Sequence, residues 1–464
     1  MDYTQLNLTQ KQEMLQTIGI DSVDQLFEVI PPSVRCEEGL DLSPALSELE
    51  LQRQLAEMAN HNHGAHNMTC FMGCGAYDHF YPVHIDQLSN RGEFLTSYTP
   101  YQAEASQGSL QAFFEFQTQI ARLAGLDIAN ASLYDGATAV AEAALLAVNT
   151  TRRHEVLVAS TLHPEYLAVL KTVLADLAVT IKEIPSRGCR VHPADIESLL
   201  SDKTAAVIVQ SPNVWGQIED WEGCFGVARA VPKTAGIAVF NPIACGLLKT
   251  PGECGADIAA GEGQPLGNAL NLGGPYLGLL AAKEKYMRKM PGRLVGMTTD
   301  EDDRRVFCLT LQTREQHIRG AKATSNVCTN QGLMALRASM FMTSLGSVGL
   351  KEMAEQCWHK AHYLASEIAN IDGWELGFDG SFFNEFTVHC PVPVTTVVEE
   401  GKRRGLLVGV AAAGRRMRGL SAGDELIVAV TEKRTKQEID KLVENLKPLG
   451  LASASRTGVV AMTK

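Results

Sequence analysis

Side chains able to bind and orient a small polar substrate are concentrated between Arg91 and Gly108, in the segment RGEFLTSYTPYQAEASQG. Polar and aromatic residues alternate there with Pro100, and the apolar spacing fits neither a helix nor a strand. Loops of this length inside a compact domain are usually functional. The polar side chains of the segment include Tyr98, Thr99, Tyr101, Gln102, Glu104 and Gln107. Their density predicts the lining of a site, with an ordinary surface loop as the alternative.

A second polar segment runs from Leu311 to Gln331 and contains LQTREQHIR and ATSNVCTNQ. Burying so many hydrogen-bonding side chains is costly unless each finds a partner. Guanidinium and ammonium groups bind carboxylates and phosphates. The candidates for contact with a substrate or another chain are Arg314, His317, Arg319, Lys322 and Asn326. A solvated face is the alternative interpretation.

Asp135 precedes an alanine-rich stretch that continues to Ala147, and its side chain is suited to cap a helix there. A helix N-terminus that carries Gly136 and Thr138 is also suited to hold a phosphate. The residues alone favour neither a structural cap nor a phosphate cradle.

Glycines dominate the stretch from Gly255 to Gly278, GADIAAGEGQPLGNALNLGGPYLG. A dinucleotide-binding loop would need a helix that opens directly on the glycines. Because Pro265 lies inside this loop, we predict a glycine-rich connection in a sheet instead. There is no lysine or arginine from Thr250 through Ala282.

Histidines and cysteines that could bind a metal occur between His61 and Cys74. They are His61, His63, His66, Cys70 and Cys74, and their spacing matches no zinc module. We therefore predict a structural loop and no metal site.

Short apolar runs alternate with helical patterns through the middle of the chain, which predicts βαβ units and a mostly parallel sheet. Capping-box spacing at Thr9 and Ser22, and Ser43 before Pro44, predict helices near the N-terminus. Two long helices are expected over 332–343 and 350–368, followed by a smaller α+β unit whose last helix is capped by Thr435 with Glu438. The expected division is 1–108, a helical extension with the polar loop; 109–345, a large α/β domain; and 346–464, a small α+β domain.

The composition narrows the class of protein. A net charge of -12 argues against nucleic acid or an anionic membrane as the main partner. Eleven scattered cysteines suit free thiols in a reducing compartment. The N-terminus MDYTQLNLTQ has no signal-peptide pattern, and no apolar run predicts a membrane span, so we expect a cytoplasmic protein.

Several long motifs resemble those of a known protein family, which their apolar periodicity alone would not reveal. In order, they are MTCFMGCGAYDHFYP, GEFLTSYTPYQAEASQG, IANASLYDGATAVAEAALLA, GADIAAGEGQPLGNALNLGGPYLG, PGRLVG, LTLQTREQHIRGAKATSNVCTNQ and VAVTEKRTKQEID. Together they closely resemble the glycine dehydrogenase (decarboxylating) family, the P-protein of the glycine cleavage system. The resemblance is to the N-terminal or alpha subunit of the bacterial form that is split into two chains, and it covers nearly the whole sequence.

The resemblance implies an aspartate-aminotransferase-like fold, which is fold type I of the pyridoxal-phosphate-dependent transferases. It implies an oxidoreductase of glycine catabolism that decarboxylates glycine and passes the aminomethyl group to the lipoyl arm of the H-protein. It also implies a beta subunit as partner. Such an enzyme holds its cofactor on a lysine, but the corresponding loop here reads Gly263-Gln264-Pro265-Leu266. The strand end where an acid is usual reads Phe240-Asn241.

We therefore expect the beta subunit to bind pyridoxal phosphate and this chain to complete the active site across the interface. Tyr98, Thr99, Tyr101 and Gln102 are the expected catalytic residues. Candidates for contact with substrate or partner are Glu104, Gln107, Asp135, Arg314, His317 and Asn326. The alternatives are a non-catalytic scaffold of the same fold that stabilises its partner, and an autonomous pyridoxal-phosphate enzyme that uses Lys249.

Overall fold

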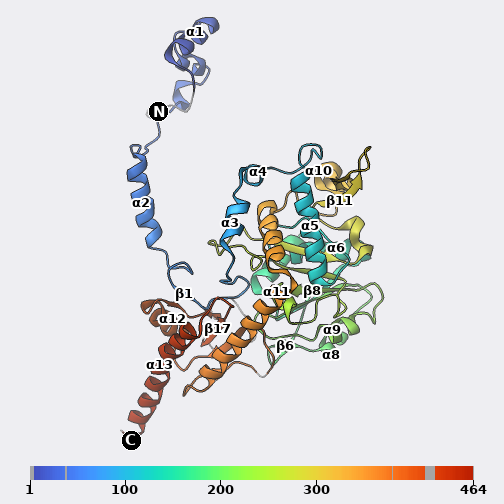
Figure 1. The fold of residues 1–464 in the computed structure, drawn as a ribbon, viewed down its shortest axis with the longest axis vertical. Helices are drawn as coiled ribbons and strands as arrows, with labels where there is room; N and C mark the ends of the chain where they lie inside the picture. Colours follow the sequence, from blue (N-terminus) through green and yellow to red (C-terminus); the bar gives the residue numbers. More distant parts are fainter. Residues whose placement is uncertain (1–4, 37–38, 379, 413–423, 463–464) are drawn as a thin grey trace. The chain divides into compact units, whose positions relative to one another are not determined.

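The computed structural model describes residues 5–36, 39–378, 380–412 and 424–462 (Figure 1). The chain divides into two compact units, one extending to Asn62 and the other beginning at His63. The second unit contains both the large sheet and the small C-terminal sheet. The expected boundaries after residues 108 and 345 stay a prediction.

The first unit is helical, as the sequence predicts. It contains α1 (Leu8–Ile18), η1 (Val23–Phe27), η2 (Pro32–Val34) and α2 (Glu48–Asn60). The predicted starts at Thr9 and Ser43 are wrong. Capping boxes instead join Asn7 with Gln10 and Ser47 with Glu50, because these side chains satisfy the free backbone N–H groups of the first turn. No residue of these four helices is buried, so they have no core of their own.

A seven-stranded sheet forms the centre of the second unit, in the order β2-β10-β9-β8-β7-β3-β4. Neighbouring strands from β9 through β4 are parallel, whereas β10 is antiparallel to both β9 and β2. The predicted mostly parallel sheet is therefore confirmed. The strands are β2 (Ile128–Ala129), β3 (Glu155–Ala159), β4 (Thr180–Ile184), β7 (Thr204–Ser211), β8 (Ala235–Phe240), β9 (Ile258–Glu262) and β10 (Gly278–Ala282).

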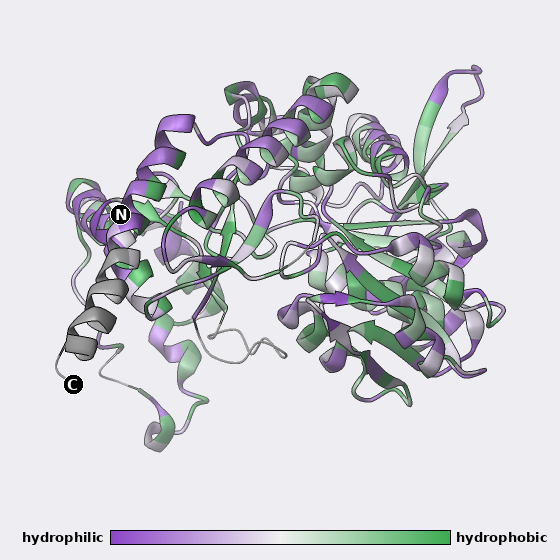
Figure 2. Ribbon diagram, turned by 90° about the horizontal axis from the view of Figure 1, so that it is seen from below, coloured by the Kyte–Doolittle hydropathy of each residue, from purple (hydrophilic) through white to green (hydrophobic). Residues whose placement is uncertain are grey.

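Helices cover both faces of this sheet, because successive strand residues point to opposite sides. Val156 and Ile237 face a core shared with α6 and α7, whereas Leu157 and Ala238 face a core shared with α5, α9 and α11. The strands are coloured mainly as hydrophobic in Figure 2, as expected for a sheet buried on both faces. The helices are α5 (Gln107–Ala124), α6 (Gly136–Thr151), α7 (Pro164–Leu174), α8 (Pro193–Leu199), α9 (Trp221–Ala228) and α11 (Gly332–Ala369).

Some elements differ from the sequence pattern. β9 begins at Ile258, and the carboxylate of the preceding Asp257 is held by Lys283, Lys285 and the Gly236 N–H group. The pattern did not predict α9 or the hairpin of β11 (Leu294–Thr299) and β12 (Arg305–Thr310). The hairpin exposes its tip to solvent, so its apolar spacing is weak.

The helix α11 links the large sheet to the C-terminal part and lies beside both α5 and α13 (Lys436–Met462) (Figure 1). Its backbone leaves the helical region at Gly346, with φ 61° and ψ -174°, so the two predicted helices are its two halves. By length and composition alone α11 could cross a membrane. The break at Gly346 and the burial of Ala338, Phe341 and Ala354 in the main core suit a helix of a globular domain.

The C-terminal part is a four-stranded sheet in the order β13-β14-β17-β16, with α12 (Val394–Arg403) and α13 packed against it. Its strands are β13 (Glu375–Leu376), β14 (Glu385–His389), β16 (Val410–Ala411) and β17 (Glu425–Ala429). Glu438 bonds to the backbone N–H and hydroxyl of Thr435, which confirms the predicted cap of the last helix. The short strand β1 (Thr69–Cys70) pairs with β15 (Leu406–Leu407), so the segment after His63 reaches this part of the chain.

Candidate functional site

The carboxyl ends of the parallel strands meet at one edge of the large sheet, where α/β folds bind ligands. The loop after β3 brings His163 to this edge, the end of β8 brings Asn241, and the loop after β9 brings Gln264. The N-terminus of α6 reaches the same edge, because its Gly136 N–H group bonds to Glu262 at the end of β9.

Two carboxylates of the chain itself occupy the N-terminus of α6. Asp135 accepts a hydrogen bond from the Thr138 N–H group at 2.8 Å, which confirms the predicted cap. Glu262 Oε2 accepts from the Gly136 N–H group at 2.9 Å. A Cβ atom at position 136 would lie 2.4 Å from the Tyr166 hydroxyl. The cradle that a phosphate would need is therefore filled, and a structural cap is the better interpretation of Asp135.

Glu262 is held by three backbone N–H groups, those of Gly136, Gln264 and Leu277, each at 2.9 Å. The residue is 8% exposed. Burial raises the pKa of Glu262 to about 7, while the three N–H groups favour its charged form. A carboxyl group of this chain is thus built into the place where a cofactor would bring its phosphate.

Gln264 occupies the position at which the family resemblance leads one to look for a lysine. Its Oε1 accepts from the Tyr77 N–H group at 2.9 Å, and its Nε2 donates to the carbonyl oxygens of Tyr77 at 3.0 Å and Asn268 at 2.8 Å. At 1% exposure the amide has no access to solvent. Its role is to fasten the segment around Tyr77 onto the glycine-rich loop.

The segment from Cys70 to Tyr77 lies against this edge and is joined to it by hydrogen bonds. His163 Nε2 lies 2.9 Å from the Cys74 carbonyl oxygen, and a Cβ atom at Gly75 would lie 3.6 Å from the His163 ring. The Tyr77 hydroxyl donates to Glu385 at 3.0 Å, and burial together with Glu385 raises the pKa of Tyr77 well above its usual value. Hydrogen bonds to His163 and Glu385 therefore hold the Cys74–Tyr77 segment at this edge.

The residues at this edge do not fit pyridoxal phosphate. No lysine lies in the loop between β9 and β10. At the end of β8, Asn241 Oδ1 accepts a hydrogen bond from the Ile243 N–H group. Glu262 occupies the N-terminus of α6, where a phosphate would bind. The nearby lysines are engaged elsewhere. Lys249 pairs with Glu222 at 2.8 Å, and Lys283 pairs with Asp257 at 3.0 Å.

The polar loop predicted between Arg91 and Gly108 begins with a short helix, α4 (Gly92–Leu95), which the pattern missed, and continues as an irregular segment to Ser106. Tyr98 is 84% exposed and Tyr101 is 48% exposed. Gln102 and Glu104 are also exposed. A cavity of about 190 Å³ opens beside the loop, lined by Phe94, Tyr98, Thr99, Pro100, Phe113, Thr329, Asn330 and Leu336. The two predicted polar segments thus meet at one surface.

Tyr101 lies at the centre of a small polar group. Its hydroxyl accepts from Arg293 Nη2 at 2.8 Å, and its ring meets the His317 ring edge-on with 5.6 Å between centroids. Arg314 is buried and donates to the carbonyl oxygens of Met290 and Gly292, so it fixes the turn before Arg293. The structure therefore brings Tyr101, His317 and Arg314 into one neighbourhood. It adds Arg293, which the sequence pattern did not single out except as part of the PGRLVG motif.

Other candidates lie apart from this group. The amide of Gln107 is used to join α5 to β12, with bonds to both the N–H and the carbonyl of Phe307. Asn326 lines a separate cavity of about 690 Å³ beside α6. Glu142 on α6 lines the same cavity and is buried, and burial raises its pKa to about 7. An alanine-rich helix gave no reason to single out this glutamate.

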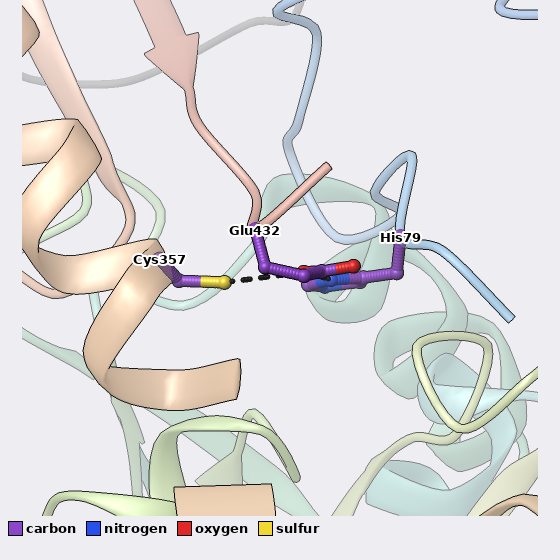
Figure 3. A group of neighbouring side chains, drawn as sticks. All are labelled: His79, Cys357 and Glu432. Carbon is purple, nitrogen blue, oxygen red and sulfur yellow. Dashed lines mark hydrogen bonds and ion pairs between the residues drawn. The ribbon is translucent and has the colours of Figure 1, made fainter. Parts of the chain in front are cut away.

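His79, Cys357 and Glu432 form a compact group outside this edge (Figure 3). His79 Nδ1 lies 2.7 Å from Glu432 Oε2, the Cys357 thiol donates to the same oxygen at 3.4 Å, and the Phe80 N–H group donates to Oε1 at 2.7 Å. Burial would raise the pKa of Glu432, but His79 and the Phe80 N–H group stabilise the carboxylate and lower its pKa below the usual value. The carboxylate is satisfied by the protein, so we assign the group a structural role.

None of His61, His63, His66, Cys70 and Cys74 belongs to a group with metal-ligand geometry in the described part of the chain.

The chain matches a family model for the glycine cleavage system P-protein over residues 1–446. It is 48% identical to the probable glycine dehydrogenase (decarboxylating) subunit 1 of Prosthecochloris aestuarii over 94% of this chain and 97% of that one. It is 47% identical to the subunit 1 of the same description from Thermomicrobium roseum over 94% of this chain and 96% of that one.

Among solved structures, a glycine decarboxylase (P-protein) of the glycine cleavage system in inhibitor-bound form superposes with a TM-score of 0.88 at 40% identity, covering 97% of this chain and 100% of that one. The Lactobacillus brevis glutamate decarboxylase superposes with a TM-score of 0.68 at 11% identity, covering 89% and 95%. The latter likeness concerns the fold alone, which is fold type I of the pyridoxal-phosphate-dependent enzymes, as predicted. By its match over residues 1–446 and its closely similar relatives, the chain belongs to the glycine cleavage system P-protein family.

Proposed function

We propose that the chain is the alpha subunit, or subunit 1, of a two-chain glycine dehydrogenase (decarboxylating). The complex decarboxylates glycine and transfers the aminomethyl group to the lipoyl arm of the H-protein. The full-length similarity to chains described as subunit 1 supports this role, and the word subunit implies a partner chain. The acidic net charge and the free cysteines favour a cytoplasmic complex without nucleic acid or membrane as partner.

The observation that carries the proposal is the burial and hydrogen bonding of Gln264. A buried amide with three hydrogen bonds stands where a covalently bound cofactor would need a lysine. In this reaction class pyridoxal phosphate supplies an electron sink, and the protein supplies position and electrostatics. We therefore place the cofactor on the beta subunit, with no step of the chemistry at the filled edge of this chain.

The contribution of this chain is its exposed polar loop. Tyr98, Tyr101 and Gln102 offer hydroxyl and amide groups at the surface, and Thr99 lines the adjoining cavity. Glycine offers little beyond its amine and carboxylate, so a few well-placed hydrogen bonds must orient it. We propose that these side chains reach the active site of the beta subunit across the interface.

The test is reconstitution from separately purified chains. We expect glycine-dependent exchange of carbon dioxide from the mixture of this chain and a beta subunit, and none from either chain alone. We also expect that this chain, incubated with pyridoxal phosphate, retains no cofactor absorbance after dialysis and no lysine trapped by borohydride. A trapped Lys249 would support the autonomous enzyme instead.

A scaffold that only stabilises its partner makes a different prediction. In that case Tyr98→Phe and Tyr101→Phe would leave the exchange activity of the reconstituted complex unchanged. A partial loss of activity in a complex of unchanged assembly and melting temperature would exclude the scaffold.

A further inference from the structure

Arg293 is a buried cation without an acidic partner. The residue is 3% exposed, and no ion pair joins it to an Asp or Glu among the residues that the structure describes. Its Nε atom is buried and has no hydrogen-bond partner. Burying a guanidinium costs several kcal/mol unless it is paired, so a fold that needed only packing would favour an apolar side chain here.

The guanidinium group is directed at Tyr101. Its Nη2 donates to the Tyr101 hydroxyl at 2.8 Å, and its central carbon lies 5.4 Å from the centre of the Tyr101 ring. The backbone of Arg293 is fixed, because its carbonyl accepts from the Ala131 N–H group at 2.9 Å. The preceding Gly292 has a φ of +73°, and Arg314 holds its carbonyl oxygen. A rigid support thus carries the cation to an exposed tyrosine.

This contact determines what Tyr101 can do. A phenol hydroxyl has one proton to donate and lone pairs to accept with. Arg293 can only donate, so the Tyr101 oxygen is the acceptor and its proton must turn away from Arg293. No acceptor for that proton is found in the described part of the chain. The hydroxyl of this half-exposed tyrosine therefore has a proton free to donate to a group outside the described chain.

We propose that Arg293 is a positioning residue that makes Tyr101 a hydrogen-bond donor toward an anionic oxygen in the active site of the partner subunit. This inference rests on the proposed function and deepens it. The shared chemistry of the acceptor is an oxyanion, which either the carboxylate of glycine or the phosphate of the cofactor can supply. The uncompensated charge of Arg293 favours such an anion over a neutral acceptor.

The test is a double-mutant cycle on the reconstituted complex with Arg293→Met, Tyr101→Phe and both together. We expect each single variant to lower kcat/KM for carbon dioxide exchange about tenfold, and the double variant to be no worse than about twofold below either single one. Such non-additivity arises when Arg293 acts through the Tyr101 hydroxyl. A purely structural Arg293 would give losses that multiply to about a hundredfold, and that result would overturn the proposal.

Two further readouts identify the anion. If the hydroxyl meets the carboxylate of glycine, the glycine concentration needed for half of the cofactor's absorbance change rises in the same variants. If it meets the phosphate, the complex loses pyridoxal phosphate more readily on dialysis while the glycine response stays unchanged. If neither the glycine response nor the retention of the cofactor changes, the inference is wrong.

Arg293→Lys serves if the methionine variant does not fold, because it keeps the charge but lacks the planar fork. Its cycle with Tyr101→Phe is read in the same way. Arg153→Lys is the matched control, since Arg153 also donates to neutral oxygens, those of Thr204 and Thr234, but at the amino ends of β7 and β8. It should leave kcat/KM unchanged. An inactive wild-type complex would refute the proposed function and this inference with it, whereas an active wild type with additive variants would refute only the inference.

Discussion

Replacing Gln264 by lysine tests whether the filled edge of the sheet, and not only the missing lysine, prevents cofactor binding. Lysine restores the chemical group but offers no acceptor to the Tyr77 N–H group that Gln264 now satisfies at 2.9 Å. A buried N–H group without a partner costs about 1–3 kcal/mol. Placing an ammonium group at a position that is 1% exposed adds a desolvation cost of several kcal/mol.

We therefore expect Gln264→Lys to lower the free energy of unfolding by about 3–5 kcal/mol without gaining covalent cofactor. The assay is urea denaturation of the variant at neutral pH, followed by incubation with pyridoxal phosphate, borohydride trapping and dialysis. Gln111→Lys is the matched control, because the amide of the half-buried Gln111 donates to Glu115 one turn along α5, and lysine can make the same contact. That variant should unfold like the wild type. A stable Gln264→Lys protein with a trapped cofactor would refute the view that Glu262 and the Cys70–Tyr77 segment close this site.

Three other predictions follow from the same structure. Tyr98→Phe and Tyr101→Phe should each cost about 1–3 kcal/mol of transition-state binding in the reconstituted enzyme at an unchanged melting temperature; equal activity at equal stability would mean that the hydroxyls are not used. Because burial raises the pKa of Glu142 from 4.5 to about 7, its charged form is disfavoured in the folded state, and the free energy of unfolding falls as the pH rises from about 4.5 to about 7. Glu142→Gln should then stabilise the chain by up to about 3 kcal/mol near pH 8 and not near pH 4 in urea denaturation, whereas an equal effect at both pH values would contradict this. Asp135→Ala should remove the cap of α6 and cost about 1 kcal/mol by the same assay, and no loss would show that Glu262 alone caps the helix.

Local sequence determined much of this fold. The apolar runs inside β3, β7 and β8 predict strands because a sheet buried on both faces favours apolar residues on both sides of each strand. Asp135 and Glu438 were predicted as caps since a cap depends on groups only three residues apart. The polar loop that contains Tyr98 and Tyr101 could also be found, because its composition fits neither helix nor strand.

Tertiary structure decided the rest. The hydrogen bonds of Gln264 reach Tyr77, 187 positions away, and the hydrogen bond between Tyr101 and Arg293 spans 192 positions. No local pattern encodes such pairs. The sequence by itself showed that a lysine was missing from the glycine-rich loop. Only the folded chain shows that Glu262 binds the N-terminus of α6 and that the Cys74 carbonyl oxygen lies beside His163, because the burial and hydrogen bonding of those groups depend on segments that meet after folding.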